Sequence, residues 1–297
     1  MVKDNSLSSK ILDIIIYISL IFLMIVILYP IIYIFSVSVS SATAYESGRV
    51  IFLPVEFNLE TYKVIFEAGT IPRSFVNSVI YTVVYVIVSL LFTTTMAYPL
   101  SRSKERVPFK GLMSKIVIFT MFFSAGTIPN FILVKNLGLM NSMWSLILPI
   151  AVSTYNLVVM RSFFEAIPES LEEAAFIDGA NEIQIFWKVM LPLAKAALAT
   201  VGLFYGVSMW NSWFTAMLYL QSDSKYPLQL IIRHIVMQNQ LQAELAAMGD
   251  TTAAEATTNT ESLKYATLFL SILPMLAVYP FIQKYFVKGV MVGSVKG

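Results

Sequence analysis

The chain has no cysteine, a single histidine and few charged side chains. Among its 297 residues, Asp, Glu, Lys and Arg together make up 13%. Without cysteine there is no disulfide, no thiolate metal ligand and no cysteine nucleophile. His234 alone cannot build a metal site from several imidazoles, and we expect it to be a surface or packing residue. So low a charge content also cannot cover the surface of an ordinary soluble domain.

Motifs for enzymatic chemistry and for nucleic-acid binding are missing as well. The sequence has no G-x-x-x-x-G-K-[ST] stretch, so any ATP must be bound by another protein. It has neither H-E-x-x-H nor G-x-S-x-G, and no paired carboxylates within its apolar runs. The formal net charge of +2 is too small to indicate nucleic-acid binding. We therefore expect neither an enzyme nor a nucleic-acid-binding protein, and no cofactor in this chain.

What the chain has in abundance is long apolar sequence. Hydrophobic residues make up 57% of it, and the mean hydropathy is +0.74. A helix needs roughly 20 apolar residues to cross a bilayer. Six runs are suited to this: 11–36, 75–100, 115–133, 144–160, 194–220 and 266–286.

These runs predict an all-α membrane protein with six transmembrane helices. The first run exceeds the roughly 7–15 residues of a cleavable signal-peptide core, so we interpret it as an uncleaved anchor. A single six-helix domain, 11–297, then follows a short N-terminal segment, 1–10.

The distribution of Lys and Arg predicts the orientation of these helices. With both termini on one side of the membrane, that side carries thirteen Lys and Arg residues and the other carries seven. Cytoplasmic loops are enriched in these residues. Both termini and the loop 161–192 are therefore expected in the cytoplasm, and segments 37–72 and 221–262 outside it.

The two outer segments differ in character. Segment 37–72 contains FLPVEFNLETYKVIF, which indicates an ordered polar and aromatic stretch. In segment 221–262, apolar residues at helical spacing from Leu228 to Ile235 predict an amphipathic helix on the outer face of the membrane. The Thr- and Ala-rich part that follows has too little apolar content to bury itself, and we expect it to be mobile.

The cytoplasmic loop 161–192 is predicted to form two short helices. The first begins either with Pro168 at its first position or with Ser170 as its N-cap, in a capping box with Glu173. Gly179 provides the left-handed conformation that ends it.

The second helix of this loop has clear signals at both ends. Asn181 is expected to cap its start, with Gln184 as the reciprocal partner. Pro192 marks the exit into the fifth apolar run. Small side chains at Ala174 and Ala175 would let the backbone of the first helix approach a partner closely.

The pattern of this loop resembles the EAA loop of ABC-importer permeases. Glu173-Ala174-Ala175, Gly179-Ala180, Phe186 and Leu191-Pro192 occur in the order and spacing of that motif. A solvated hairpin without any partner is the plain alternative. The register of the match, and its place between the fourth and fifth of six apolar runs, favour the coupling loop.

The likeness extends over nearly the whole chain, and it is greatest to carbohydrate permeases of the maltose-type group. Within that group, the chain looks like the subgroup near the lipoprotein-associated and oligosaccharide permeases. The segments that carry this finer resemblance are Asn77-Ser78, 126–149, 210–214 and 283–297.

The resemblance implies a type I ABC importer permease fold and a role as half of a sugar-translocating pore in the bacterial inner membrane. The implied partners are a second, related permease in a heterodimer, ABC ATPase subunits that bind ATP and Mg, and an extracytoplasmic solute-binding protein. By the family pattern, the residues that contact the ATPase are Glu173, Ala174, Ala175, Gly179 and Pro192. We add the loop charges Asp178 and Lys188.

Polar and aromatic residues within the apolar runs are candidates for the sugar pathway. Sugars bind to aromatic faces and to amide or hydroxyl groups, and polar side chains inside a membrane face the bundle interior. The candidates are Trp210, Asn211, Ser212, Trp213, Asn77 and Tyr155. Such residues also join helices by hydrogen bonds, and for Ser78 and Asn156 we favour that structural role.

Two alternative functions fit a six-span protein. One is a permease of the same fold for another solute, such as a peptide or polyol, which the loop does not distinguish. The other is an ion-coupled secondary carrier. Apart from Asp13 near one end, the six apolar runs lack the acidic and basic relays of such carriers.

Overall fold

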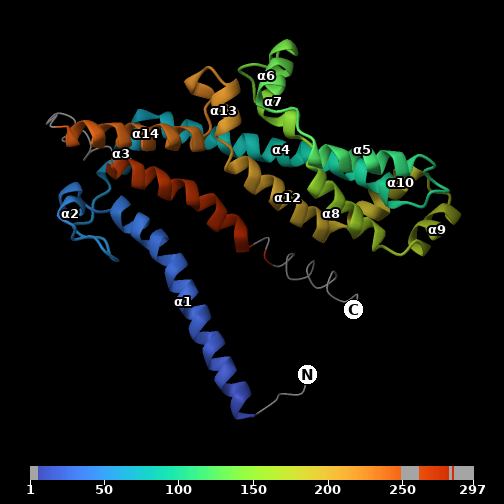
Figure 1. Cartoon of the computed structure of the whole chain (residues 1–297), viewed down its shortest axis with the longest axis horizontal. Helices are drawn as coiled ribbons and strands as arrows, with labels where there is room; N and C mark the ends of the chain where they lie inside the picture. Colours follow the sequence, from blue (N-terminus) through green and yellow to red (C-terminus); the bar gives the residue numbers. More distant parts are fainter. Residues whose placement is uncertain (1–5, 249–260, 281–282, 284–297) are drawn as a thin grey trace. The chain divides into compact units, whose positions relative to one another are not determined.

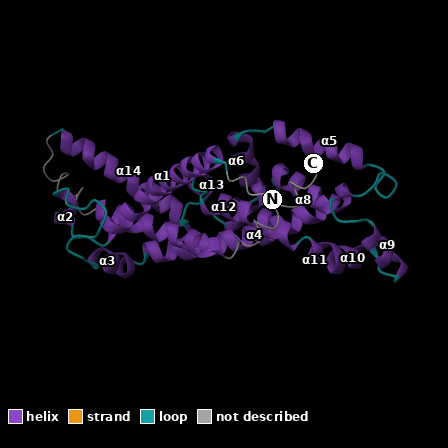
Figure 2. Ribbon diagram, turned by 90° about the horizontal axis from the view of Figure 1, so that it is seen from below, coloured by secondary structure: helices purple, strands orange, loops and turns teal. Residues whose placement is uncertain are grey.

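The computed structural model describes residues 6–248, 261–280 and 283 (Figure 1). Over these residues the chain is helical, and it contains no strand (Figure 2). It divides into two compact units: 1–72 with 232–273, and 73–231 with 274–297.

Within the described residues, three helices are long and apolar enough to cross a bilayer unbroken. They are α1 (Leu7–Ser38), α4 (Thr70–Ser101) and the helix Glu261–Pro280. Three bent pairs of helices bring the total to six if each pair is one span. The six-span prediction thus matches the architecture. The end of its last run, 281–286, lies outside the described residues except for Gln283.

The third, fourth and fifth predicted spans are wrong as continuous helices. The third is split into α5 (Lys110–Phe122) and α6 (Thr127–Asn136), which are bent by 114°. Gly126, at the start of α6, has a φ of +87° that favours glycine. The fourth is split at 151–153 between the short helices α7 (Met143–Ile147) and η1 (Leu148–Ile150) and helix α8 (Thr154–Glu165).

The fifth predicted span is broken in the middle of the sequence WNSW. Helix α12 (Lys195–Trp210) ends there, and α13 (Phe214–Tyr219) begins after three non-helical residues. Asn211 is the C-cap of α12, and its side-chain amide donates to the carbonyl of Val207 at 2.9 Å. Asn and Ser compete in this way with the helical hydrogen bonds, which explains the break.

In the first unit, the segment after α1 is ordered, as predicted. It contains α2 (Ala42–Glu46) and α3 (Glu60–Ala68). The hydroxyl of Ser36 donates to the carbonyl of Phe52 at 2.7 Å, and Tyr62 donates to the hydroxyl of Ser38 at 2.8 Å. Hydrogen bonds from Ser41 and Arg49 lower the pKa of the Glu56 carboxyl.

The second unit has a single large core around α4, α8 and α12. Its largest fully buried side chains include Tyr205, Phe164 and Met160. α12 approaches α4 closely at Gly202, where an added Cβ would lie 3.3 Å from a methyl carbon of Leu90. Small residues permit such close contact between membrane helices.

Two tyrosine hydroxyls form hydrogen bonds with backbone groups at the break before α8. The hydroxyl of Tyr205 lies 2.6 Å from that of Thr93 on α4 and accepts a hydrogen bond from the amide of Ser153 at 3.0 Å. Tyr85 donates to the carbonyl of Ile150 at 2.9 Å. A backbone group freed in a membrane needs such a partner, because hydrocarbon offers none.

The opposite end of α4 is fixed to the segment that follows α13. Asn77 donates to the carbonyls of Ser224 and Tyr226, at 2.9 and 3.1 Å, and Tyr81 donates to that of Lys225 at 2.9 Å. The predicted outer helix begins directly afterwards, as α14 (Leu228–Ala247), and is a dozen residues longer than expected. The Thr- and Ala-rich stretch 249–260, predicted to be mobile, lies outside the described residues.

Replacing Tyr205 by Phe removes the hydroxyl that joins Thr93 to the Ser153 amide. We expect the free energy of unfolding to fall by about 1–3 kcal/mol, because the half-buried Ser153 amide and the buried Thr93 hydroxyl lose their partner. Thermal or denaturant unfolding of the purified chain measures this. Tyr17→Phe, which alters an exposed tyrosine of α1, is the matched control and should leave stability unchanged. Equal stability of the two variants would contradict the assigned role.

Candidate functional site

The loop between α8 and α12 forms a chain of short helices at one end of the second unit. These are α9 (Ser170–Ile177), α10 (Glu182–Ile185), the π-helical turn η2 (Phe186–Met190) and α11 (Leu191–Leu193). Both predicted starts of the first helix are wrong. α9 begins at Ser170, after Glu169 as N-cap, and no side chain caps it. The amides of Glu172 and Glu173 instead bond to the Glu169 carbonyl, which sets the first turn.

The turn at Gly179 and the start of α10 are confirmed as predicted. Gly179 has a φ of +83°. The amide of Ala180 bonds to the carbonyl of Ala175, and that of Gly179 to Phe176, each at 3.0 Å, which is the Schellman pattern. Asn181 and Gln184 form the reciprocal capping box. The relative placement of α9 and α10 is therefore fixed by local sequence.

The residues predicted to contact an ATPase lie on the surface of this loop. Glu173, Ala174, Asp178, Gly179, Lys188 and Pro192 are exposed, and Ala175 is half-buried.

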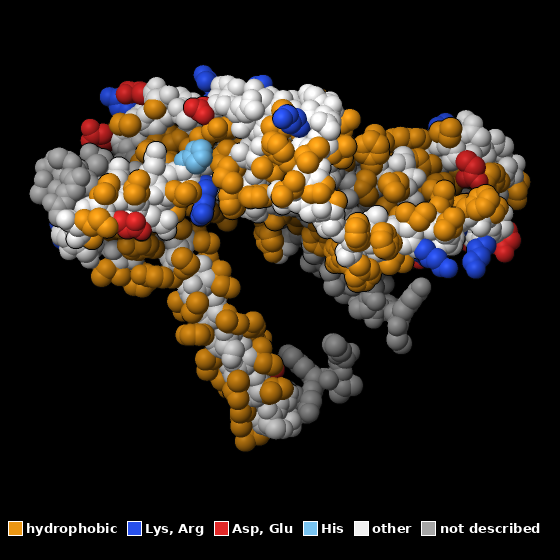
Figure 3. Space-filling view, turned by 45° about the horizontal axis from the view of Figure 1, so that its top comes forward, with side chains coloured by type: hydrophobic (Ala, Val, Ile, Leu, Met, Phe, Trp, Pro, Cys, Tyr) orange, Lys and Arg blue, Asp and Glu red, His pale blue; other side chains and the backbone are white. Residues whose placement is uncertain are grey.

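Three large apolar side chains that the sequence interpretation missed are exposed on the same loop. The exposed fraction is 86% for Ile177, 71% for Ile183 and 53% for Trp187. Hydrophobic side chains lie among charged ones at this end of the molecule in Figure 3. An isoleucine directly before the Asp178-Gly179 turn of a polar loop is the signal that could have found Ile177.

Glu172, in the first turn of α9, is fully buried. Its carboxylate forms ion pairs with Arg102, at the end of α4, and with Arg106, whose Nη1 lies 2.6 Å from Oε2. The Arg102 guanidinium also donates to the carbonyl of Phe164 at 3.1 Å. Buried carboxylates are retained only with such partners.

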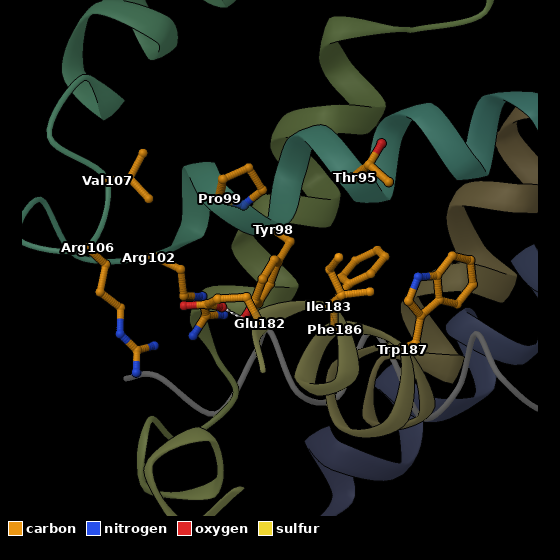
Figure 4. A pocket seen from close by; sticks show the side chains of 10 residues that line it. All are labelled: Thr95, Tyr98, Pro99, Arg102, Arg106, Val107, Glu182, Ile183, Phe186 and Trp187. Atoms are coloured by element: carbon orange, nitrogen blue, oxygen red, sulfur yellow. Dashed lines mark hydrogen bonds between the residues drawn. The ribbon is translucent and has the colours of Figure 1, made fainter. Parts of the chain in front are cut away.

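A groove of about 540 Å³ lies between the end of α4 and the helices α10 and η2 (Figure 4). Tyr98 crosses it and donates to Glu182 at 3.0 Å. Ile183, Phe186 and Trp187 provide its apolar wall, and Arg102 and Arg106 lie at its other end. The lining of this groove therefore comes from both the loop and the end of α4.

A second cavity, of about 330 Å³, lies at the break before α8. Its lining is uncharged: Tyr85, Ser153, Tyr155, Asn156, Phe204, Tyr205 and Ser208. Aromatic rings with hydroxyl and amide groups are suited to binding a sugar. No cluster of three or more metal-ligating side chains occurs in the part of the chain that the structure describes.

Of the predicted pathway residues, only Tyr155 lines this cavity. Trp210, Asn211, Ser212 and Trp213 lie at the break after α12, and the rings of Trp210 and Phe75 are 5.9 Å apart. Asn77 donates to the backbone carbonyls of Ser224, within η3 (Asp223–Lys225), and of Tyr226, directly after it. Ser78 accepts from the Leu228 amide at 2.7 Å, which confirms its structural role.

Sequence interpretation missed the contribution of α12 to this cavity. Phe204 and Ser208 are four residues apart and lie on one face of the helix. A serine at that spacing from an aromatic residue was the available signal.

The family of binding-protein-dependent transport system inner membrane components matches residues 2–292. The chain belongs to this family. Its fold is that of an ABC importer permease, and it is a multi-pass membrane protein. This membership sets aside the ion-coupled carrier.

Two curated relatives from Bacillus subtilis (strain 168) are similar over most of the chain. Protein LplC is 41% identical over 90% of this chain and 89% of its own length. The polygalacturonan/rhamnogalacturonan transport system permease protein YtcP is 40% identical over 98% of this chain and all of its own. A solved bacterial ABC transporter involved in the import of the acidic polysaccharide alginate contains a chain that is 38% identical. It superimposes with a TM-score of 0.85 and covers 95% of this chain and 99% of that one.

Replacing Gly179 by Ala forces a Cβ into a left-handed conformation, at a cost of about 1–2 kcal/mol. We expect faster hydrogen exchange of amides 176–182, because the turn between α9 and α10 loosens. Gly111→Ala is the matched control, since that glycine has open space and no positive φ. Unchanged exchange in Gly179→Ala would show that the turn does not depend on the glycine.

Proposed function

We propose that this chain forms half of the translocation pore of an ATP-driven importer of sugar oligomers. The observation that carries the proposal is the exposed loop α9–Gly179–α10, with the EAA pattern, in a member of the importer permease family. Its surface combines carboxylates, small residues and apolar side chains. A partner ATPase that receives α9 in a cleft would complete both the apolar and the charged contacts.

In this proposal the chain couples ATP hydrolysis to transport without binding the nucleotide. ATP and Mg are held by the ATPase subunits, whose closure displaces α9 and α10. The two short helices are fixed to each other by the Gly179 turn and the Asn181 cap, so they move as one element. A loop without internal hydrogen bonds would absorb the displacement instead.

The proposed orientation places both termini and the loop 161–192 in the cytoplasm. Segments 37–72 and 221–262 then face the outside, where a solute-binding protein delivers the sugar. The excess of Lys and Arg on the cytoplasmic side supports this. A second, related permease completes the pore, which makes the permease pair a heterodimer.

The proposed substrate is an oligosaccharide that this chain contacts through uncharged groups. The names of two similar proteins point to fragments of acidic polysaccharides. The cavity beside Tyr155 has no basic side chain, so it would bind hydroxyl groups and sugar faces rather than carboxylates. In this proposal the binding protein, or the partner permease, selects for charge.

Purification of the tagged chain from gently solubilised native membranes tests the coupling role. Wild type is expected to bring down one ABC ATPase and a second six-span permease, identified by mass spectrometry. The double variant Glu173→Arg/Gly179→Val should lose the ATPase and keep the permease, because a reversed charge and a strained turn spoil the docking surface. Gly111→Ala is the control. An ATPase that is recovered equally with the double variant would refute the coupling role.

Alanine substitutions at Tyr155, Asn211 and Trp213 test the proposed sugar pathway. In proteoliposomes of the complete transporter, loss of the Tyr155 ring should slow uptake about tenfold, as expected for about 1.4 kcal/mol of lost stacking. Trimers of galacturonate, of alginate and of arabinose are the probes. Unchanged uptake and unchanged ATPase stimulation in Asn211→Ala and Trp213→Ala would exclude those two residues from the pathway.

A further inference from the structure

The one fully buried side chain that attaches helix α9 to the second unit is charged, and two half-buried apolar side chains pack against the core beside it. Glu172 is its only buried residue, and Ala175 and Phe176 are half-buried. The other five residues of the helix are exposed. Amphipathic helices usually bury apolar residues most deeply, whereas in α9 the most deeply buried side chain is a carboxylate.

Both cations that hold Glu172 come from the end of α4 and the turn after it. The side chain of Arg102 is 5% exposed, and that of Arg106 is 32% exposed. The Arg106 guanidinium also lies over the Phe176 ring of α9, with its central carbon 4.8 Å from the ring centroid. α9 is thereby held at two successive turns by the same short segment.

Stability alone does not require ions at this place. A buried ion pair can often be replaced by apolar side chains of similar volume without loss of stability. Charged hydrogen bonds differ from apolar contacts in their directionality, since they fix the distance and angle between the groups. An apolar contact would let α9 slide along α4, whereas these pairs hold one register.

α4 extends from this junction to the far side of the second unit without a break. Its 32 residues span about 48 Å at 1.5 Å per residue. Near its start, Asn77, Ser78 and Tyr81 are bonded to the backbone between Ser224 and Leu228. Midway along α4, Tyr85 bonds directly to the backbone at the break before α8, and Thr93 is linked to the same break through the Tyr205 hydroxyl.

We propose that Glu172, Arg102 and Arg106 are positioning residues that lock α9 to α4. When the ATPase displaces α9, the movement is then transmitted along α4 to the segment 224–228. In the proposed orientation, that segment faces the binding protein. This inference rests on the proposed function, and it assigns the coupling path within that function. Among the described helices of the second unit that could cross the membrane, α4 alone is unbroken, which suits it to this task.

The first test replaces Glu172 by Gln in the complete transporter reconstituted in proteoliposomes. We expect assembly and basal ATPase activity to persist, because Gln keeps the size of the side chain. Stimulation of the ATPase by binding protein loaded with a galacturonate trimer, and sugar transported per ATP, should each fall about fivefold. Glu105→Gln, the same change at an exposed residue of the α4–α5 turn, is the matched control and should behave as wild type.

A purely structural role predicts a different result. The yield of complexes would fall, but those that assemble would show the wild-type stimulation ratio, and this outcome would overturn the proposal. If Glu172→Gln does not assemble, Arg106→Gln gives the same test, because it leaves the Arg102–Glu172 pair in place. Wild type that transports no trimer of galacturonate, alginate or arabinose would refute the proposed function itself, which is a separate result.

The second test measures whether α9 and the end of α4 move as one body. The chain has no cysteine, so Glu105→Cys and Glu169→Cys can carry spin labels without background labelling of this subunit. The distance between the labels should be the same in nucleotide-free and ATP-trapped complexes, and it should broaden when Glu172→Gln is added. A distance that changes with nucleotide in the otherwise wild-type chain would overturn the rigid link.

Discussion

A backbone amide or carbonyl in the membrane must find a partner within the protein, and this constraint organises the second unit. Every bent pair of helices interrupts the helical ladder and frees such groups. At the break before α8 the partners are the hydroxyls of Tyr85 and Tyr205. At the end of α12 the Asn211 side chain returns to its own helix. Tyr85 and Tyr205, whose hydroxyls bond to the backbone at the break before α8, also line the uncharged cavity.

Composition and apolar runs predicted the class of fold and the approximate number of spans, because both depend on sums over many residues. The breaks were not predicted, since a hydropathy window averages over Gly126 or Asn211 and registers only the apolar residues around them. Tyr205 illustrates the limit. Its hydroxyl bonds to Thr93 and Ser153, which are far away in sequence, and no local sequence pattern predicts these contacts.

The loop between α8 and α12 was predictable where local chemistry decides the conformation. Gly179 and the Asn181–Gln184 box act over a few residues, and the structure has both. The predicted start of α9 was wrong because the Glu169 carbonyl, and not the Ser170 side chain, accepts from the amides of the first turn. Glu173 faces outward, whereas Glu172 is buried against two arginines about 66 and 70 positions earlier in the chain. Only the tertiary fold distinguishes the two carboxylates.

The contrast between unbroken and broken spans has a consequence for synthesis of the protein in the cell. The face of α1 seen in Figure 3 is largely apolar, and the helix has no buried residue along its most apolar stretch, so lipid alone can accommodate it as soon as it leaves the ribosome. The segment around Ser153 is different, because its free amide is satisfied only once Tyr205 has been made and inserted. We therefore expect the fourth span to insert stably only after the fifth has been made. The positions of hydrogen-bond partners along the sequence would then set the order in which the spans become stable in the membrane.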